Sequence, residues 1–417
     1  MRILIIVHQF YPEYSGGTEK VTFGLAKLAQ KAGHFVRVLT CVTGELNSDT
    51  WEQGCSEYLW DTTYQGIPVS AIRSADIDAS AEYSLGHDVP LVGQISQLLE
   101  LENYDVCHVM HAMRMASAIQ AVQNCNIPYI LSLTDFYLPC YRINYIRQEG
   151  NLCGGSQGGV NCGTKCLLPD WRPAFFLDRY SMAQKIVELA QYVVCPSEYV
   201  AALYSQEFPD AKFKVVAHGI DLSLCRIREN DHKVDEIVFG YLGSIGPVKG
   251  LEILIEAFQQ VVGDNLRLNI CGGFVNDDGY EKTIRNLVSL DERVNLLPAV
   301  NPREVFDVLQ TFDLLCIPSV VPETFSLVFH EAMAAQVPAM VSALGAPQYH
   351  IETYQCGSVV PAGDRRAWTV ALETVAERPE LLASWRDELP LPLRIEEEAF
   401  IYQTLYLQST SQTSVVD

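Results

Sequence analysis

The sequence predicts an α/β protein made of two Rossmann-like domains. Residues 2–7 form a continuous apolar run, as in a buried parallel strand, and a glycine-containing loop and an amphipathic helix follow it. The same strand, loop and helix order returns at residues 236–262. A chain of 417 residues is long enough for two domains with separate cores. Strand and helix patterns alternate after both starts, which predicts a mainly parallel sheet in each half.

The composition limits the classes of partner. The chain is 48% hydrophobic and 19% charged, as in an ordinary globular protein, and its formal net charge is −22. Such an acidic chain argues against nucleic acid as a partner and against electrostatic docking on an anionic membrane. A weak or hydrophobic peripheral membrane contact stays open. No apolar run of about 18 residues is present, so no transmembrane helix is expected.

The cysteines indicate the compartment. The 13 cysteines are an odd number scattered through strands and loops. The chain also enters its first strand directly after Met1, without a basic leader or a cleavage site. Together these features predict free thiols in a reducing cytoplasm, in place of a disulfide framework.

The first domain begins with a loop that could approach a ligand. Gly16 and Gly17 follow the first strand, and a helix from Thr18 follows them. The loop lacks the G-x-G-x-x-G pattern, so the sequence gives little support to a dinucleotide site. A simple tight turn is the alternative.

Two later strands of this domain end in polar side chains. After an irregular stretch at residues 44–66, we expect a helix at 91–101 and strands at 104–111 and 129–135. The second of these strands ends at Asp135. His108 and His111 lie in the first, where histidines are more often satisfied core or strand-end residues than catalysts.

Four cysteines follow in a glycine-rich segment. Cys140, Cys153, Cys162 and Cys166 fall within 27 residues. Four thiolates would suit a structural zinc ion or an iron–sulfur cluster. A metal would also explain how a segment with few apolar residues stays ordered. Four free thiols in a loop are an equally weighted alternative.

In the second domain, a strand at residues 314–317 leads through a Pro/Ser loop into a helical pattern. Glu323 and Glu331 bracket the junction eight residues apart, and Thr324 is the expected N-cap. Eight helical residues rise about 12 Å, so the N–H groups of the first turn would lie between the two carboxylates and bind an anion. A nucleotide sugar has phosphates between two hydroxylated rings and fits this layout. The alternative is a solvated helix start with two ordinary glutamates.

The pattern Glu-x7-Glu, followed by Ala-Met-Ala-x-x-Val-Pro, resembles the signature of family-4 glycosyltransferases of the GT-B fold. The resemblance implies that Glu323 contacts the donor sugar and Glu331 the ribose. Lys249 matches a lysine that clamps the diphosphate, whereas Ser244 stands where an arginine is usual and adds no charge. The family usually has glycine at the position of Ser326.

Other matches extend the resemblance over nearly the whole chain. The family has a Gly-Gly loop where Gly16 and Gly17 stand, and a His-Asp pair where Thr134 and Asp135 stand. The implied catalytic residues are Glu323, Lys249 and Asp135. The implied donor-binding residues are Gly16, Gly17, Gly243, Ser244, Lys249, Gly272, Glu323, Thr324, Phe325, Ser326, Leu327 and Glu331.

The resemblance implies a fold and an activity. The fold is GT-B, with an acceptor-side domain at residues 1–222, a nucleotide-sugar domain at 236–390 facing it across a cleft, and a final helix at 394–410 that crosses back to the first domain. The activity is a retaining transfer of a sugar from a nucleotide sugar to a hydroxyl of a sugar or lipid-linked acceptor, in polysaccharide or glycoconjugate biosynthesis. The chemistry requires no cofactor, and the expected location is the cytoplasm or the inner membrane face. Two alternatives are a nucleotide-sugar epimerase and a catalytically degenerate binding protein.

Overall fold

The computed structural model describes residues 1–77, 79–166, 171–225, 236–275 and 278–413. The chain divides into two compact units. Unit 1 contains Met1–Gly219 and Ile395–Asp417, and unit 2 contains Ile220–Arg394. The stretch between the two domains expected from the sequence, residues 223–235, lies mostly outside the described residues.

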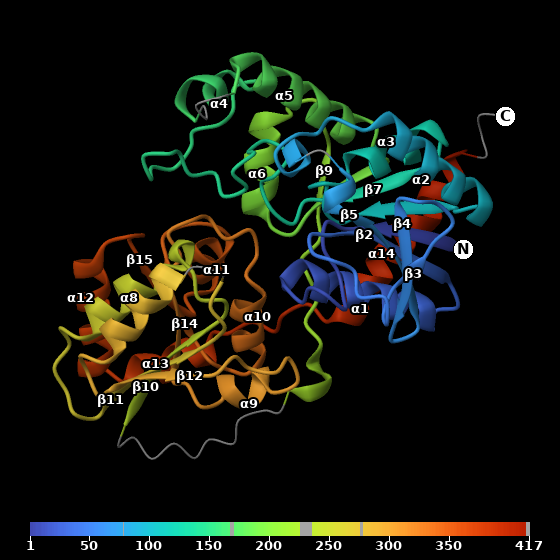
Figure 1. Ribbon diagram of the computed structural model, residues 1–417. Coiled ribbons are helices and arrows are strands. Elements are labelled where there is room, and N and C mark those ends of the chain that lie inside the picture. The colour runs from blue at the N-terminus through green and yellow to red at the C-terminus, as the bar shows by residue number, and fades with distance from the viewer. Residues whose placement is uncertain (78, 167–170, 226–235, 276–277, 414–417) are drawn as a thin grey trace. The chain divides into compact units, whose positions relative to one another are not determined.

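Unit 1 is built on a nine-stranded sheet of order β3-β4-β5-β2-β1-β6-β7-β8-β9 (Figure 1). The pairs from β5 through β2, β1, β6, β7 and β8 to β9 are all parallel. In sheet order the strands are β3 (Glu52–Gln53), β4 (Leu59–Tyr64), β5 (Ile67–Arg73), β2 (Phe35–Val42), β1 (Arg2–Ile6), β6 (Val106–Val109), β7 (Tyr129–Ser132), β8 (Tyr192–Cys195) and β9 (Phe213–Val215).

One edge of this sheet differs from the sequence prediction. The stretch at residues 44–66, expected to be irregular, contains β3 and β4, which extend the sheet by antiparallel pairing. Gln65 and Gly66 connect β4 to β5 with φ angles of 47° and 83°, as in the tight two-residue turns of hairpins. Trp51 is buried and fills the core at this edge.

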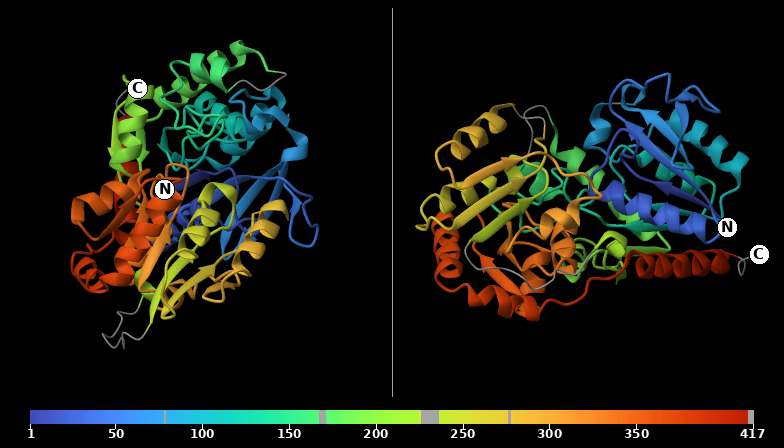
Figure 2. Two further views of the ribbon diagram at one scale, coloured as in Figure 1. Left: turned by 90° about the vertical axis from the view of Figure 1, so that its left-hand side faces the viewer. Right: turned by 90° about the horizontal axis from the view of Figure 1, so that it is seen from below.

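The helices of unit 1 include one from the end of the chain. They are α1 (Gly17–Lys31), α2 (Val89–Glu102), α3 (Ala116–Asn124), α4 (Val160–Lys165), α5 (Pro173–Glu188), α6 (Glu198–Glu207) and α14 (Ile395–Thr413). Figure 2 shows α14 beside α1 in the view from below, and the two helices pack against each other. The predicted return of the final helix to the first domain is confirmed.

Buried polar contacts attach α14 to unit 1. The hydroxyl of Tyr406 lies 2.8 Å from Nδ1 of His108, and the other ring nitrogen of His108 lies 2.8 Å from Oγ of Ser132. The fully buried carboxylate of Glu398 accepts the backbone N–H of Gly219 at 2.8 Å. Burial lowers the pKa of His108 to about 3, so this histidine is a neutral core residue.

Unit 2 contains a six-stranded parallel sheet of order β12-β11-β10-β13-β14-β15. The strands are β10 (Ile237–Leu242), β11 (Leu266–Cys271), β12 (Val294–Leu297), β13 (Leu314–Ile317), β14 (Ala339–Ser342) and β15 (Gly357–Val360). The helices are α7 (Leu251–Phe258), α8 (Asp278–Val288), α9 (Val305–Leu309), α10 (Leu327–Ala334), α11 (Ala346–Tyr354), α12 (Arg365–Glu377) and α13 (Glu380–Asp387). Phe239, Phe258 and Trp368 are fully buried in its core.

Each sheet has a topological switch point beside its first strand. In unit 1 the chain builds β2 on one side of β1 and β6 on the other, and in unit 2 it builds β11 and β13 on opposite sides of β10. In open parallel sheets, ligands bind outside the carboxyl ends of the strands at such points. The loops after β1, β6, β10 and β13 are therefore where function is expected.

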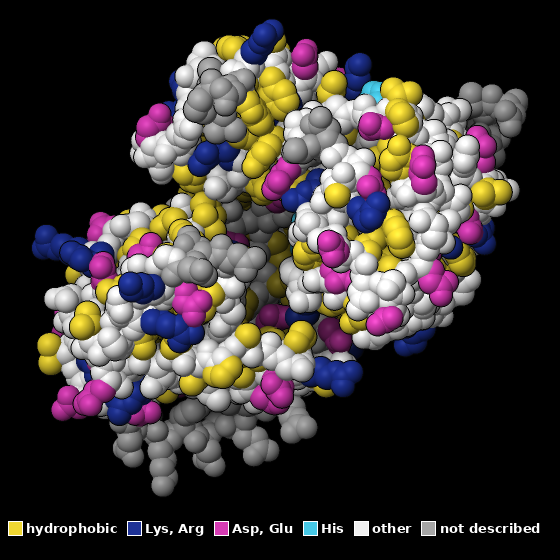
Figure 3. All heavy atoms as spheres, in the orientation of Figure 1, with side chains coloured by type: hydrophobic (Ala, Val, Ile, Leu, Met, Phe, Trp, Pro, Cys, Tyr) yellow, Lys and Arg dark blue, Asp and Glu magenta, His cyan; other side chains and the backbone are white. Residues whose placement is uncertain are grey.

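Within the described part of the chain, no helix combines the length and the apolar character needed to cross a membrane. On the faces visible in Figure 3, Lys and Arg side chains are interspersed with Asp and Glu side chains on both units.

Candidate functional site

The loops that follow β10 and β13 lie together at the switch point of unit 2. The backbone N–H of Val320 donates to the carbonyl of Val248 at 3.0 Å. Gly250 has a φ of 65°, and a Cβ on it would lie 2.2 Å from the carbonyl oxygen of Pro318. Only glycine permits this approach, and it places Lys249 beside the loop that carries Glu323.

Lys249 and Glu323, two of the predicted catalytic residues, form an ion pair. Nζ of Lys249 lies 2.7 Å from Oε1 of Glu323, and the hydroxyl of Ser319 donates to the same oxygen at 2.6 Å. Burial pushes the pKa of Glu323 upward, but the Lys249 charge and the two hydrogen bonds outweigh it, so the pKa lies below its ordinary value. The structure thus holds an ionised carboxylate and an ammonium group side by side.

A third loop fixes the backbone of Glu323. Ala346 donates its N–H to the Glu323 carbonyl at 2.8 Å, and Gly345 forms a bridge with Glu323. Gly345 has a φ of 95°, and a Cβ there would lie 2.4 Å from the same carbonyl oxygen. Gly345 is a site residue that the sequence analysis missed. Its only local signal is a glycine in the loop after β14.

The helix after Glu323 begins later than predicted. Thr324 is not the N-cap, because α10 starts at Leu327 and its N-cap is Ser326. Ser326 has a φ of 68°, which turns residues 323–325 away from the helix path, and Phe325 stacks on His330 with ring centroids 3.8 Å apart. The rise of about 12 Å therefore does not apply to the segment from Glu323 to Glu331. The start of α10 has no side-chain cap, and Glu331 is buried on the second turn.

The remaining glycines predicted to bind the donor lie at the same edge of the sheet. A Cβ on Gly272 would lie 1.8 Å from the carbonyl oxygen of Gly243, so this glycine allows the loops after β10 and β11 to meet. The backbone carbonyl of Ser244 accepts the Tyr241 hydroxyl at 2.6 Å. These contacts give Gly243, Ser244 and Gly272 a structural role, and their contact with a donor stays a prediction.

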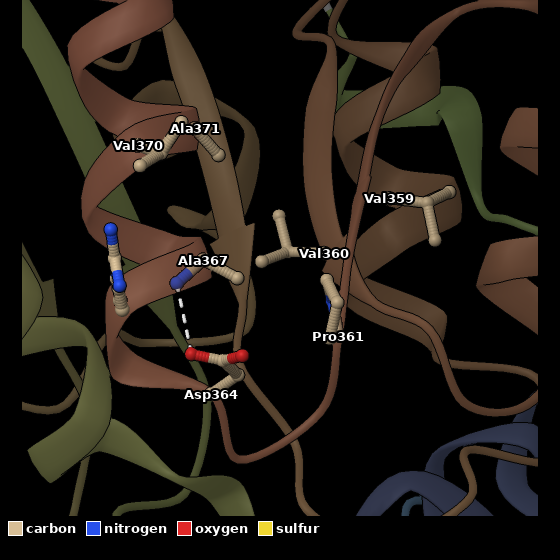
Figure 4. A pocket seen from close by; sticks show the side chains of 8 residues that line it. Val359, Val360, Pro361, Asp364, Ala367, Val370 and Ala371 are labelled. Carbon is tan, nitrogen blue, oxygen red and sulfur yellow. Dashed lines mark hydrogen bonds between the residues drawn. The ribbon is translucent and has the colours of Figure 1, made fainter.

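Unit 2 also has a shallow cavity of about 380 Å³ at the start of α12, lined in part by Val360, Ala367 and Val370 (Figure 4). The carboxylate of Asp364 caps this helix by accepting the N–H of Ala367 at 3.0 Å. A capping carboxylate would repel a phosphate from this helix start. None of the predicted site residues lines this cavity.

At the switch point of unit 1, Asp135 is held in one orientation. Its Oδ2 lies 2.6 Å from Nε2 of His111, and its Oδ1 accepts the N–H of Tyr137 at 2.8 Å. Nδ1 of His111 lies 3.1 Å from the N–H of Met113 and accepts it, so the proton of the neutral ring sits on Nε2 and points to Asp135. The arrangement presents a fixed carboxylate beside the carboxyl ends of β6 and β7.

Two further residues, His8 and Glu19, complete this group. The His8 ring packs on the His111 ring with centroids 3.9 Å apart, and its Nε2 lies 3.9 Å from Oε1 of Glu19. Burial, with smaller contributions from His111 and Arg114, lowers the pKa of His8 well below its ordinary value. Burial raises the pKa of Glu19.

The glycine loop before α1 does not stand open in this structure. A Cβ on Gly16 would lie 2.5 Å from Oε2 of Glu19, so the Glu19 carboxylate fills the space that Gly16 leaves. Gly16 and Gly17 are predicted to approach the donor. Such an approach would require the Glu19 side chain to move.

The four clustered cysteines line one small cavity of about 10 Å³. Within the described ranges, however, no group of three or more His, Cys, Asp or Glu side chains is arranged to hold a metal ion. The predicted zinc or iron–sulfur site at Cys140, Cys153, Cys162 and Cys166 is therefore unsupported. Burial raises the pKa of Cys140 to about 11 and, with the neighbouring thiols, that of Cys162 to about 12, which keeps both thiols protonated.

A buried carboxylate holds the glycine-rich segment together. Glu207, 5% exposed, accepts hydrogen bonds from the hydroxyl of Tyr145 and from the backbone N–H and hydroxyl of Ser156. The side-chain amide of Asn161 donates to the carbonyl of Gly155 at 2.8 Å. Glu207 lies far along the chain, at the end of α6, and nothing near the cysteines in the sequence indicates its role.

Comparison with known proteins identifies the family. Residues 15–224 match the model described as Glycosyltransferase Family 4, and residues 226–389 match the model described as Glycosyl transferases group 1. A D-inositol 3-phosphate glycosyltransferase of Corynebacterium efficiens is 29% identical over 41% of this chain and 44% of its own length. A lipopolysaccharide 1,2-N-acetylglucosaminetransferase of Salmonella typhimurium is 26% identical over 37% of this chain and 44% of its own length. The chain thus matches less than half the length of both curated relatives.

Solved structures share the whole fold. Sucrose-phosphate synthase from Thermosynechococcus elongatus is 20% identical with a TM-score of 0.73, and the likeness covers 99% of each chain. The Anabaena protein HepE, solved in complex with UDP and glucose, is 17% identical with a TM-score of 0.65 over 99% of this chain and 98% of its own. These likenesses confirm the predicted GT-B fold. The Family 4 model covers half of the chain, and the chain therefore belongs to glycosyltransferase family 4.

Proposed function

We propose that the protein is a retaining glycosyltransferase that moves a sugar from a nucleotide-sugar donor to an acceptor hydroxyl in polysaccharide or glycoconjugate biosynthesis. The observation that carries this proposal is the Lys249–Glu323 pair at 2.7 Å, placed at the switch point of unit 2 beside the uncapped start of α10. A diphosphate needs a cation and free N–H groups, and a sugar needs a fixed carboxylate.

In the proposed reaction, charge develops on the leaving diphosphate. Lys249 would turn from Glu323 to the phosphates, and the first-turn N–H groups of α10 would support it. Glu323, held by Ser319 and by the loop of Gly345, would then accept hydrogen bonds from the hydroxyls of the donor sugar. Glu331 would hold the ribose. This chemistry requires no divalent metal.

On the acceptor side, we propose that Asp135 orients the attacking hydroxyl. Its carboxylate is oriented by His111 and by the Tyr137 N–H, and its side chain is 26% exposed, so an acceptor hydroxyl could reach it. A carboxylate fixed in this way can accept a hydrogen bond from the attacking hydroxyl and align it.

The compared proteins support the substrate classes. HepE was solved in complex with UDP and glucose, and the Salmonella relative is a lipopolysaccharide 1,2-N-acetylglucosaminetransferase by name. A UDP-sugar is therefore the first donor to test. A sugar or lipid-linked acceptor, met at the cytoplasmic face of a membrane, is part of the same proposal.

Thermal unfolding with nucleotides tests the donor site. UDP, GDP and ADP, free and sugar-linked, are added to the wild type, to Glu331→Ala and to Glu352→Ala, an exposed control on α11. A nucleotide at 100 times its Kd adds about 2.7 kcal/mol to the free energy of unfolding. We expect one nucleotide to raise Tm in the wild type and the control but not in Glu331→Ala. Equal shifts in all three proteins would contradict the ribose role. Product analysis with donor alone separates transfer from epimerisation.

A further inference from the structure

Unit 1 also contains a cavity of about 220 Å³ that the proposed catalytic residues do not line. It lies at the carboxyl edge of the sheet, between the segment after β5 and the segment after β6. Ser84 and Asp88 line it from the first segment, and Arg114, Ala116 and Ser117 line it from the second. A water molecule takes about 30 Å³ of the liquid, so the cavity has room for a phosphate or carboxylate with part of its parent molecule.

The start of α3 borders this cavity and lacks acceptors. Its N-cap, Met115, makes no side-chain cap, and Ala116, Ser117 and Ala118 are all buried. Among the residues that the structure describes, no acceptor is found for the backbone N–H groups of residues 116–118. A buried helix start normally satisfies these groups with a side chain, water or a ligand.

Arg114 adds a cation at the same place. Its side chain is 11% exposed, and its Nη2 lies 3.2 Å from Oε1 of Glu82, a side chain that is 46% exposed. Its Nη1 is buried and has no partner among the described residues. Leaving a buried charged donor without an acceptor is unfavourable, so an anion that reached the guanidinium would be stabilised.

Two serine hydroxyls contribute further donors. Oγ of Ser117 accepts the N–H of Asp88 at 2.9 Å, and Oγ of Ser84 accepts the N–H of Gly86 at 2.9 Å. Each hydroxyl hydrogen is then available to donate. Asp88, the carboxylate of the lining, accepts the N–H of Leu91 at 2.9 Å and thereby caps α2.

We propose that this cavity binds an anionic group, a phosphate or a carboxylate, carried by the glycosyl acceptor. The assignment rests on the proposed function for the word acceptor, whereas the anion site itself rests on Arg114, the start of α3 and the two hydroxyls. Because the protein carries a net charge of −22, long-range attraction cannot draw an anion in. The local donors must provide the affinity.

Phosphate binding tests the site. Equilibrium dialysis measures the Kd of labelled inorganic phosphate in a Lys249→Met background, which removes the cation of the proposed donor site. We expect Arg114→Gln to weaken phosphate binding at least about tenfold and Ser117→Ala to weaken it less. Unchanged affinity in Arg114→Gln would overturn the proposal.

A variant expected to bind phosphate more tightly controls for loss of binding through misfolding. Glu82→Gln removes the carboxylate that competes for Arg114. This carboxylate is 46% exposed, and an ion pair with such a solvated partner is worth about 0.2–1 kcal/mol. We therefore expect phosphate to bind about one and a half to five times more tightly, an increase that misfolding cannot produce. Weaker binding in Glu82→Gln would count against the site.

A matched pair of sugars identifies the source of the anion. Glucose 6-phosphate should bind at least as tightly as inorganic phosphate, and glucose should not compete. Exclusion of glucose 6-phosphate would mark a site for free phosphate only and would overturn the acceptor assignment.

The Tm shift with a nucleotide is measured on the same variants. If nucleotides do not bind and phosphate binding still depends on Arg114, the proposed function fails and the anion site stands.

Discussion

The two units share one architecture and place opposite chemistry at its switch point. In unit 2, Lys249 and Glu323 form an ion pair, and the pKa of the carboxylate is lowered. In unit 1, the rings of His8 and His111 pack together, burial lowers the pKa of His8, and burial raises the pKa of Glu19 beside them. The parallel sheet therefore fixes where a ligand can bind, and the charged side chains on the loops at that point determine which chemical group can bind there.

The loops themselves are held by different means. In unit 2, Gly250 and Gly345 let backbones approach closely, so three loops support Glu323. In unit 1, side chains support one another, and His111 orients Asp135 through a single ring proton. We therefore expect substitutions in unit 2 to change donor binding, and substitutions in unit 1 to change stability and acceptor use.

The largest effect should come from the cation of unit 2. Lys249→Met removes the charge proposed to stabilise the leaving diphosphate, and we expect kcat/KM to fall by about 10²–10³. Lys282→Met, at an exposed position of α8, is the matched control and should keep wild-type activity. Similar rates for Lys249→Met and the control would contradict the role of Lys249.

The next effect concerns the cysteine segment, which only unit 1 contains. Glu207→Ala leaves the donors of Tyr145 and Ser156 buried without an acceptor, and we expect a loss of about 2–3 kcal/mol in the free energy of unfolding, measured in urea. Glu188→Ala, exposed on α5, is the control. EDTA should leave Tm unchanged. A large drop in Tm with EDTA would show that a metal orders the segment after all.

The acid–base contrast between the units can be measured directly. Nuclear magnetic resonance of labelled glutamates, assigned with Glu19→Gln and Glu323→Gln, should place the titration midpoint of Glu19 above the ordinary 4.5 and that of Glu323 below it. The stabilisation linked to Glu19 is then present at low pH and is lost as the pH rises through its raised pKa. The stabilisation linked to Glu323 is present at neutral pH and is lost as the pH falls through its lowered pKa. Midpoints in the reverse order would refute the contrast.

The smallest effect should come from Ser326. Its φ of 68° is unfavourable for a residue with a Cβ, so we expect Ser326→Gly to stabilise unit 2 by about 1 kcal/mol and to raise its Tm by about 2–4 °C. Ser326→Ala retains the strain and should give no gain. A loss of stability in the glycine variant would mean that the serine side chain holds the loop.

Much of the fold and part of the site followed from local patterns. Buried parallel strands are continuous apolar runs, so β1 and β10 and the alternation after them were predictable. Lys249 and Glu323 lie in the loops that follow the adjacent strands β10 and β13, which is why the sequence pattern and the geometry agree. The antiparallel strands β3 and β4 were missed because Trp51 and polar residues hide their alternation.

The rest of the site depends on contacts between distant segments. The support of the cysteine segment by Glu207 and that of Glu323 by Gly345 join residues that no local period connects. The N-cap of α10 was predicted at Thr324 because threonine is a common N-cap residue. The prediction was wrong because the backbone turns at Ser326, which has a positive φ, and the helix starts after it. Local propensity indicates which residues could cap a helix, and the tertiary contacts determine which of them does.

The central claim is that unit 2 binds the donor and unit 1 the acceptor. Calorimetric titration of the nucleotide that stabilises the wild type, repeated on Lys249→Met and Asp135→Asn and paired with a turnover assay, tests it most directly. We expect both variants to lose turnover. We expect Lys249→Met to bind the nucleotide at least about tenfold more weakly, and Asp135→Asn to bind it as the wild type does. Wild-type nucleotide affinity in Lys249→Met, or weakened affinity in Asp135→Asn alone, would contradict the claim.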